Sequence, residues 1–322
     1  FYVGHKDGAN AARSLASKKP EWMAVTNTGG NYAPDDESRF QMLNPANREA
    51  CAYLLSVYRY ILQKYEVDGF QLDYIRYYQS GAVDFGYDDA TLDAFQARYG
   101  VRPEYDPAAS YWEDWVSFRC DYVTEMVRQI RALIDEIRPD VLLGADVGPD
   151  PAEARGTLYQ DYMRWLEEGY IDILHPMSYG SGFEEAIRRQ TAACGMDAFI
   201  APGLGIYMEE LRPEDMRAQA QFDTQAGTDG SLYFESGAFL GKQTGAALLP
   251  SLFRRKAVAP YRNRVEALEY LLAYAKEHIE QVLLPLDGVT AAEAGAVNAA
   301  IDAAGEAAED GRIPAAEWDA LL

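Results

Sequence analysis

The sequence has few cysteines, few histidines and no long hydrophobic run. Its three cysteines, Cys51, Cys120 and Cys194, show no CxxC or Cys/His spacing, so we expect no zinc site and no disulfide framework. The three histidines form no metal-spaced pair. No apolar stretch reaches the ~18 residues that a membrane-spanning helix needs. We therefore expect no bound metal and no membrane-spanning segment.

The signature motifs of several enzyme classes are also missing. The chain has no glycine-rich phosphate loop and no GxSxG nucleophile elbow, so nothing predicts a nucleotide cofactor or a serine-hydrolase mechanism. We expect no cofactor of any kind.

Basic residues are scarce as well. The chain has 29 Lys and Arg against 51 Asp and Glu, which gives a formal net charge of -22. This charge repels phosphate backbones and anionic lipid surfaces, so nucleic acid is not an expected partner. The 23 tyrosines suit contacts with sugar faces, although most tyrosines in any protein fill cores and rims.

Between about residues 22 and 240, short apolar runs alternate with longer amphipathic runs. This alternation is typical of repeated βα units, whose helical crossovers make the sheet parallel. The expected strands are 22–26, 67–77, 141–146, 171–179, 199–203 and 231–235, and the expected helices are 47–65, 89–99, 111–138, 159–169, 184–194 and 213–225.

We interpret residues 1–250 as an α/β domain, a (β/α)8 barrel whose first strands are missing from this sequence, because fewer than eight strands can be counted. The first residue is Phe1 and no signal peptide is visible, which is consistent with a processed or truncated chain. Residues 251–322 have a different sequence pattern. This pattern predicts helices over 261–284 and 290–310. We expect them to form a helical C-terminal extension.

Residues Val67–Tyr77 form an apolar strand pattern that ends in an acid, a tyrosine and an arginine. Strand residues alternate between faces, so Gln71, Asp73 and Ile75 are expected on one side. The carboxyl ends of parallel strands are where ligands bind in α/β folds. Asp73 is therefore the first candidate for a catalytic group.

Residues Leu43–Asn47, followed about twenty residues later by Val67–Tyr77, resemble the glycosyl-hydrolase-like family ten barrels of bacteria. The likeness continues through Trp115–Arg119 and over 165–179, 201–207 and 230–234. The resemblance implies a barrel, usually exported to the cell envelope or outside the cell, that acts on or binds polysaccharide. It implies that Asp73 ends the fourth strand, Asp146 the fifth and His175–Tyr179 the sixth, with Tyr207 after the seventh and Glu235 at the close of the eighth.

Glycoside hydrolysis needs two carboxyl groups, one to donate a proton and one to attack carbon or activate water. Asp73 is the candidate nucleophile or charge stabiliser. Asp146 and Glu235 are the candidates for the acid/base, and the sequence does not decide between them. Asp68 and Asp172 begin their strands, so they belong to the opposite end of the sheet and are expected to have structural roles.

Six further residues are candidates for substrate binding. The aromatic ones are expected to stack on sugar rings, and the polar ones to bind hydroxyls, with loop-holding or core-filling roles as the alternatives. They are Asn44, Tyr74, Arg76, His175, Tyr179 and Tyr207.

The leading hypothesis is a secreted bacterial glycoside hydrolase acting on an oligosaccharide or polysaccharide. The alternative is a non-catalytic glycan-binding barrel of the bacterial envelope. A third hypothesis, a lyase or isomerase, lacks the metal and phosphate signatures that such barrels use.

Overall fold

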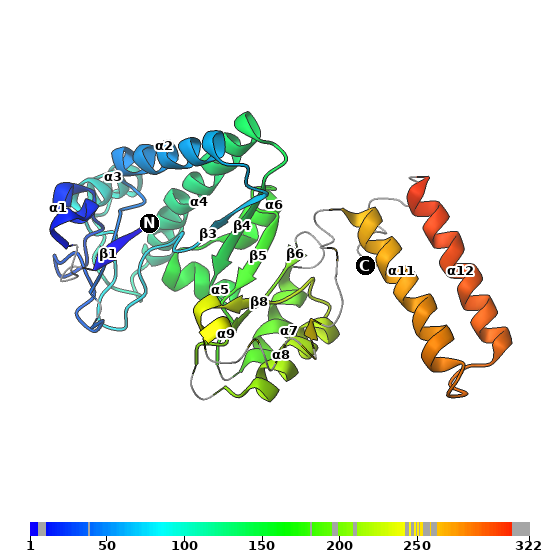
Figure 1. The fold of residues 1–322 in the computed structure, drawn as a ribbon. Helices are drawn as coiled ribbons and strands as arrows, with labels where there is room; N and C mark the ends of the chain where they lie inside the picture. The colour runs from blue at the N-terminus through cyan, green and yellow to red at the C-terminus, as the bar shows by residue number, and fades with distance from the viewer. Residues whose placement is uncertain are drawn as a thin grey trace. The chain divides into compact units, whose positions relative to one another are not determined.

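The computed structural model describes residues 1–5, 11–37, 39–180, 182–194, 199–208, 211–241 and 263–310, together with residues 245, 248, 250, 252, 253 and 258. The chain divides into two compact units, Phe1–Thr244 and Gly245–Leu322. The first unit is an α/β structure and the second is helical (Figure 1).

A parallel sheet forms the centre of the first unit. Four strands lie side by side and parallel, in the order β3 (Gly69–Leu72), β4 (Leu142–Val147), β5 (Ile173–Pro176) and β6 (Phe199–Ile200). Two residues after β6 the chain enters β7 (Gly203–Gly205), which pairs in parallel with β8 (Leu232–Phe234). Because β6 and β7 are almost continuous, the strand order follows the chain from β3 to β8.

Helical crossovers connect these strands, which is why neighbouring strands run parallel. The helices of the α/β unit that flank or connect the strands are α2 (Arg48–Lys64), α3 (Asp89–Tyr99), α4 (Trp112–Ile137), α6 (Tyr162–Glu167), α7 (Phe183–Cys194) and α8 (Pro213–Ala226). Figure 1 shows α2 and α4 along one side of β3 and β4. This sequential order is that of a (β/α) barrel. Within the described residues no strand pairs with the outer edge of β3 or β8, so closure of the barrel is not detected.

Several short elements complete the first unit. β1 and β2 pair antiparallel in a separate sheet, and α5 continues directly into the π-helix η3. The bounds are β1 (Tyr2–His5), η1 (Ala11–Arg13), α1 (Leu15–Lys18), η2 (Pro20–Trp22), β2 (Phe40–Met42), α5 (Pro151–Glu153), η3 (Ala154–Leu158) and α9 (Ser236–Gly241).

Helix boundaries follow from local sequence. Asn47 precedes α2 and accepts a hydrogen bond from Ala50 N at 3.0 Å, and Asp88 does the same for α3 through Thr91 N. These side chains bind backbone N–H groups that have no partner within the first helical turn. Gly100 ends α3 at φ 79°, a left-handed conformation that glycine adopts without steric cost.

Two sequence-based expectations are wrong in detail. Residues 22–26 form no strand of the parallel sheet, because Trp22 ends η2 and only isolated antiparallel bridges from Met23 and Thr26 follow. β3 is also much shorter than 67–77 and ends at Leu72, since the chain turns at Tyr74.

The described residues of the second unit include the helices α11 (Arg264–His278) and α12 (Ala291–Glu309), with the π-helix η4 (Ile279–Leu283) after α11. Thr290 and Glu293 form a capping box at the start of α12. Lys276 of α11 pairs with Asp302 of α12. The expected helix start at Tyr261 lies outside the described residues.

Candidate active site

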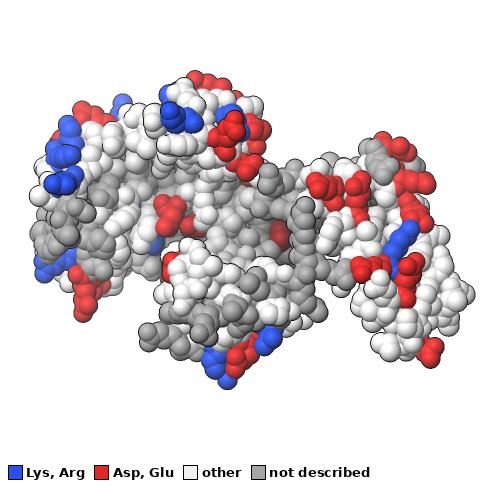
Figure 2. All heavy atoms as spheres, in the orientation of Figure 1, with Lys and Arg blue, Asp and Glu red and all other residues white. Residues whose placement is uncertain are grey.

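Asp73 stands at the carboxyl end of β3, where the backbone leaves the strand. The next residue, Tyr74, has φ 53°, a left-handed conformation that is uncommon for a residue with a side chain. Tyr74 N donates to Asp73 Oδ1 at 2.7 Å. This turn leaves Asp73 exposed, and Figure 2 shows acidic side chains at the surface near this end of β3.

Asp146 lies one strand away, near the end of β4. Gln71 and Leu72 pair with Gly144 and Ala145, so Asp73 and Asp146 follow at the same level of adjacent strands. Gln71 Nε2 donates to Asp146 Oδ1 at 2.6 Å. Burial raises the pKa of Asp146 to about 6, with a further contribution from the negative charge of Asp73.

Arg76 provides the positive charge of this group. Its guanidinium lies 5.0 Å from the centroid of the Tyr74 ring. Burial lowers the pKa of Arg76, while the charges of Asp73 and Asp146 are among those that raise it. One cation therefore lies near two carboxylates.

His175 of β5 pairs in register with Asp146. Its Nδ1 lies 3.2 Å from Ala201 O, and because a carbonyl only accepts, Nδ1 carries the proton and Nε2 is left as an acceptor. A Cβ on Gly144 would lie 3.2 Å from Nε2, so glycine at this position leaves room for the imidazole. Burial lowers the pKa of His175, which keeps the ring neutral at pH 7.

Three aromatic rings meet at the carboxyl ends of β5, β7 and β8. Tyr179 stacks on Phe234 with centroids 5.9 Å apart, and Tyr207 meets both rings edge-on. Tyr207 and Phe234 are 42% and 43% exposed. A Cβ on Gly203 would lie 2.8 Å from Cε1 of Tyr179, so this close packing requires glycine. The three rings, called the aromatic cluster below, form a partly open apolar surface.

The aromatic cluster lies near enough to Asp146 and Asp73 for their charges to affect the pKa of Tyr179. The pKa of Tyr179 is raised mainly by burial and next by the negative charge of Asp146, with Asp73 contributing as well. Phe234 was not among the expected binding residues. Its position at the end of the expected strand 231–235 is the feature of the sequence that could have identified it.

Asn44 and Tyr74, two of the expected binding residues, hold other parts of the protein together. Asn44 is 3% exposed, and it donates to Asp88 Oδ2 at 2.6 Å and accepts from Ala46 N at 3.0 Å. These bonds fit the loop-holding alternative. The ring of Tyr74 packs against those of Tyr2 and Phe40.

Glu235 follows β8, and its carboxylate binds the start of α9. Its oxygens accept from Gly237 N at 3.0 Å and from Ala238 N at 2.8 Å. Such bonds stabilise a helix N-terminus. The structure thus gives Glu235 a capping role, whereas the hydrogen bond to Asp146 from the described part of the chain comes from a neutral side-chain amide.

The loop after β3 is held by a buried ion pair. Arg119 of α4 is 0% exposed and donates from Nη1 to Asp84 Oδ2 at 2.6 Å. Tyr159 OH donates to the other oxygen of Asp84 at 2.6 Å, and the Tyr159 ring covers the guanidinium at 3.9 Å. Because the loop carries Asp84, this network fixes the segment that follows Asp73 to α4.

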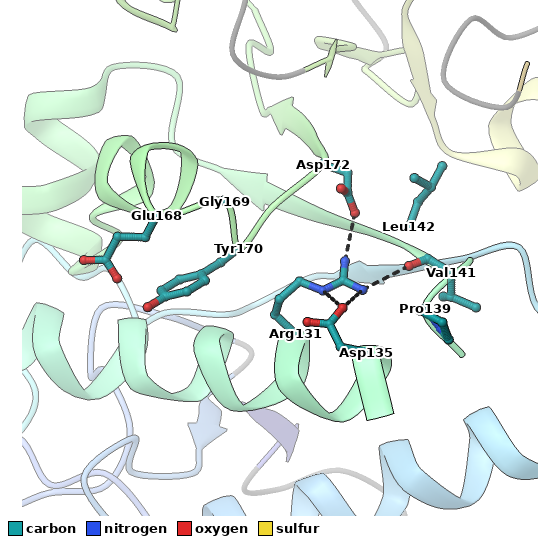
Figure 3. Close-up of a pocket in the computed structure, with 9 residues that line it drawn as sticks. All are labelled: Arg131, Asp135, Pro139, Val141, Leu142, Glu168, Gly169, Tyr170 and Asp172. Carbon is teal, nitrogen blue, oxygen red and sulfur yellow. Dashed lines mark hydrogen bonds and ion pairs between the residues drawn. The ribbon is translucent and has the colours of Figure 1, made fainter. Parts of the chain in front are cut away.

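A pocket of about 410 Å³ lies at the other end of the sheet (Figure 3). It is lined in part by Arg131, Asp135 and Asp172. Arg131 pairs with both acids, at 3.1 Å to Asp172 and 2.8 Å to Asp135. Asp172 Oδ2 also accepts from Leu143 N at 2.7 Å, which agrees with the structural role expected for an acid at a strand start.

Within the described ranges, no group of three or more His, Cys, Asp or Glu side chains is placed to hold a metal ion. No helix in the described part of the chain is long and apolar enough to span a membrane.

The fold and the site define an α/β protein of the barrel type with an acidic and aromatic group at the carboxyl ends of its strands. A family model described as Glycosyl hydrolase-like 10 matches residues 1–207, and the chain belongs to this family.

Two known proteins extend this relationship. Glycosyl hydrolase YngK of Bacillus subtilis (strain 168) is 26% identical over 188 residues, which cover 53% of this chain and 32% of the relative. The chain therefore matches about a third of the length of that relative. The solved structure of the PgaB (BpsB) glycoside hydrolase domain from Bordetella bronchiseptica aligns with a TM-score of 0.53 at 15% identity, covering 70% of each chain. This second likeness shows the fold alone.

Proposed function

We propose that this chain hydrolyses glycosidic bonds of a polysaccharide, with Asp146 as acid/base and Asp73 as nucleophile or charge stabiliser. The observation that carries the proposal is the pair of carboxyl groups at the ends of adjacent strands, one of them with its pKa raised to about 6. A pair of acids in unlike environments is the arrangement that divides acid and anion roles in glycosidases.

The remaining groups have roles consistent with this division. In its protonated form Asp146 donates to the glycosidic oxygen, while the Asp73 carboxylate faces the anomeric carbon. Nε2 of His175 accepts a hydrogen bond from a sugar hydroxyl, and the exposed rings of Tyr207 and Phe234 stack on neighbouring sugar units. We propose Asp146 over Glu235 as the acid because both oxygens of Glu235 already bind backbone N–H groups.

A second candidate function is glycan binding without cleavage. The aromatic cluster favours it, because exposed rings bind sugar faces whether or not a bond is broken. In either case we expect an exported protein that meets its glycan outside the cytoplasm.

The test is the release of reducing ends from a panel of bacterial and plant polysaccharides by the full-length protein. We expect cleavage by the wild type and a loss of about 10²–10⁴-fold in Asp73→Asn. Asp172→Asn, at the opposite end of the sheet, is the matched control and should retain activity. Unchanged cleavage by Asp73→Asn contradicts the role given to Asp73, and glycan binding with no reducing ends supports the second candidate.

A further inference from the structure

Gln71 is a polar residue of β3 that the catalytic proposal does not use. It lies opposite Gly144 in the parallel register, and its side chain reaches the neighbouring Asp146 on β4. Alternation along β3 places Gln71 on the face opposite Phe70, whose ring packs on Tyr58 of α2 at 5.7 Å. Gln71 is exposed, so it lies on the open face of the sheet and not in the core behind it.

The bond between Gln71 and Asp146 is directional. A glutamine N–H donates, so Oδ1 of Asp146 is the accepting atom, and the distance of 2.6 Å is short for such a bond. A proton that binds Asp146 is thereby directed to Oδ2, because Oδ1 already accepts from the amide. The bond also fixes the plane of the carboxyl group between β3 and β4.

We propose that Gln71 is a positioning residue that holds Asp146 by Oδ1 and leaves Oδ2 as the atom that exchanges a proton with the substrate. This inference rests on the proposed function for its catalytic meaning. The geometry of the two side chains supports it independently.

The electrostatic surroundings of Asp146 are consistent with this role. Burial and the charge of Asp73 raise its pKa, whereas the Gln71 hydrogen bond and the charge of Arg76 lower it. His175 and Tyr179, from β5 and the residues after it, face the same group. Gln71 is the side chain that hydrogen-bonds Asp146 directly, and removing it should therefore raise the pKa of Asp146 above about 6.

The decisive measurement is an NMR titration of the Asp146 carboxyl carbon in the full chain, with the signal assigned by its loss in Asp146→Asn. Gln71→Met keeps the length of the side chain and removes the donor, and we expect the titration midpoint to rise. Gln71→Glu adds a second carboxylate and should raise it further. An unchanged midpoint in Gln71→Met overturns the proposal.

The matched control is Gln129→Met. Gln129 of α4 donates to Glu125 at the same 2.6 Å distance on the helix surface, so its removal should leave Asp146 unchanged. If both Met variants shift Asp146 equally, the effect is general and the proposal fails.

Kinetics then separates the positioning role from a structural one. The alkaline limb of the kcat/KM profile should move to higher pH in Gln71→Met, with a loss of about tenfold in kcat. If the limb does not move while the wild type is active, the role given to Gln71 is wrong. If the wild type cleaves no glycan, the proposed function fails, and the titration still decides whether Gln71 holds Asp146.

Discussion

Acidic side chains lie at both ends of the parallel sheet, and the groups that bind their carboxylates differ between the two ends. At the amino end, Asp172 binds the Leu143 N–H and pairs with Arg131, and Asp229 binds the Ile200 N–H at 2.8 Å. At the carboxyl end, within the described residues, Asp146 has a neutral amide as its hydrogen-bond partner, and Asp73 accepts from the N–H of the next residue.

This difference separates carboxylates that stabilise the fold from carboxylates that are available for chemistry. An acid that is bound by a backbone N–H and a cation has its lone pairs occupied and lowers the free energy of the folded state. An acid buried without such partners resists ionisation and destabilises the folded state at neutral pH. We infer that this cost is retained at the carboxyl end because it makes Asp146 a proton donor.

The strongest test of the comparison is Asp146→Asn, which should lower activity and raise stability together. Loss of the acid/base should reduce glycan cleavage by about 10²–10⁴-fold. The folded-state pKa of about 6 lies above the ordinary 3.8, so wild-type stability falls as pH rises from about 4 through 6. Asparagine cannot ionise, so at pH 8 the variant should be more stable than the wild type by about 1–3 kcal/mol.

Denaturant unfolding at pH 4 and pH 8, followed by tryptophan fluorescence, measures this effect. At pH 4 the two proteins should differ much less, because Asp146 is then mostly protonated in the folded wild type. A variant that is less stable than the wild type at pH 8 would place Asp146 among the structural acids.

The opposite result is expected at the amino end. Asp172→Ala leaves the Leu143 N–H and the Arg131 guanidinium without this partner, and it should lower the free energy of unfolding by about 1–3 kcal/mol. Glycan cleavage per folded molecule should be unchanged. The control is Asp140→Ala, which removes an exposed partner of Arg138 and should have a much smaller effect. If Asp172→Ala abolishes activity in a folded protein, the two ends are not functionally distinct.

The smallest effect is expected in the aromatic cluster. Tyr207→Ala removes a ring that is 42% exposed, and it should weaken oligosaccharide binding severalfold, up to about tenfold, because one stacking contact contributes about 0.5–1.5 kcal/mol. Isothermal titration calorimetry with an inactive Asp73→Asn background measures this change. Tyr60→Ala removes a ring of α2 that is 57% exposed, and it should leave the affinity unchanged. Equal losses in both variants would mean that Tyr207 belongs to no binding surface.

Much of the fold could be predicted from the sequence because it depends on local patterns. The helices α3, α4, α7 and α8 lie within a few residues of their expected bounds, since apolar periodicity and capping residues depend only on near neighbours in the chain. The parallel order of the later strands also follows from the helices between them. The prediction of a strand at 22–26 is wrong, because a short apolar run forms a strand only if another strand lies beside it to pair with.

The candidate site was predictable only in part. The sequence shows that Asp73 and Asp146 lie near the carboxyl ends of two strands. The structure places them with Arg76 and His175 at or just beyond the ends of the adjacent strands β3, β4 and β5. The hydrogen-bond partners of these acids cannot be identified from the sequence. Gln71 and Asp146 are separated by 75 residues in the chain, and Arg119 and Asp84 by 35. Such contacts depend on strand register and side-chain rotamers, which no local pattern encodes.

The sequence by itself therefore determined the α/β class, the order of the later strands and the placement of acids near strand ends. These features depend on periodicity and composition within short segments of the chain. Only the tertiary structure decided that β3 ends before Asp73, that Glu235 caps α9 and that Gln71 holds Asp146. These outcomes depend on which groups meet across the sheet. The availability of a carboxylate is set by the partners that the fold brings to it.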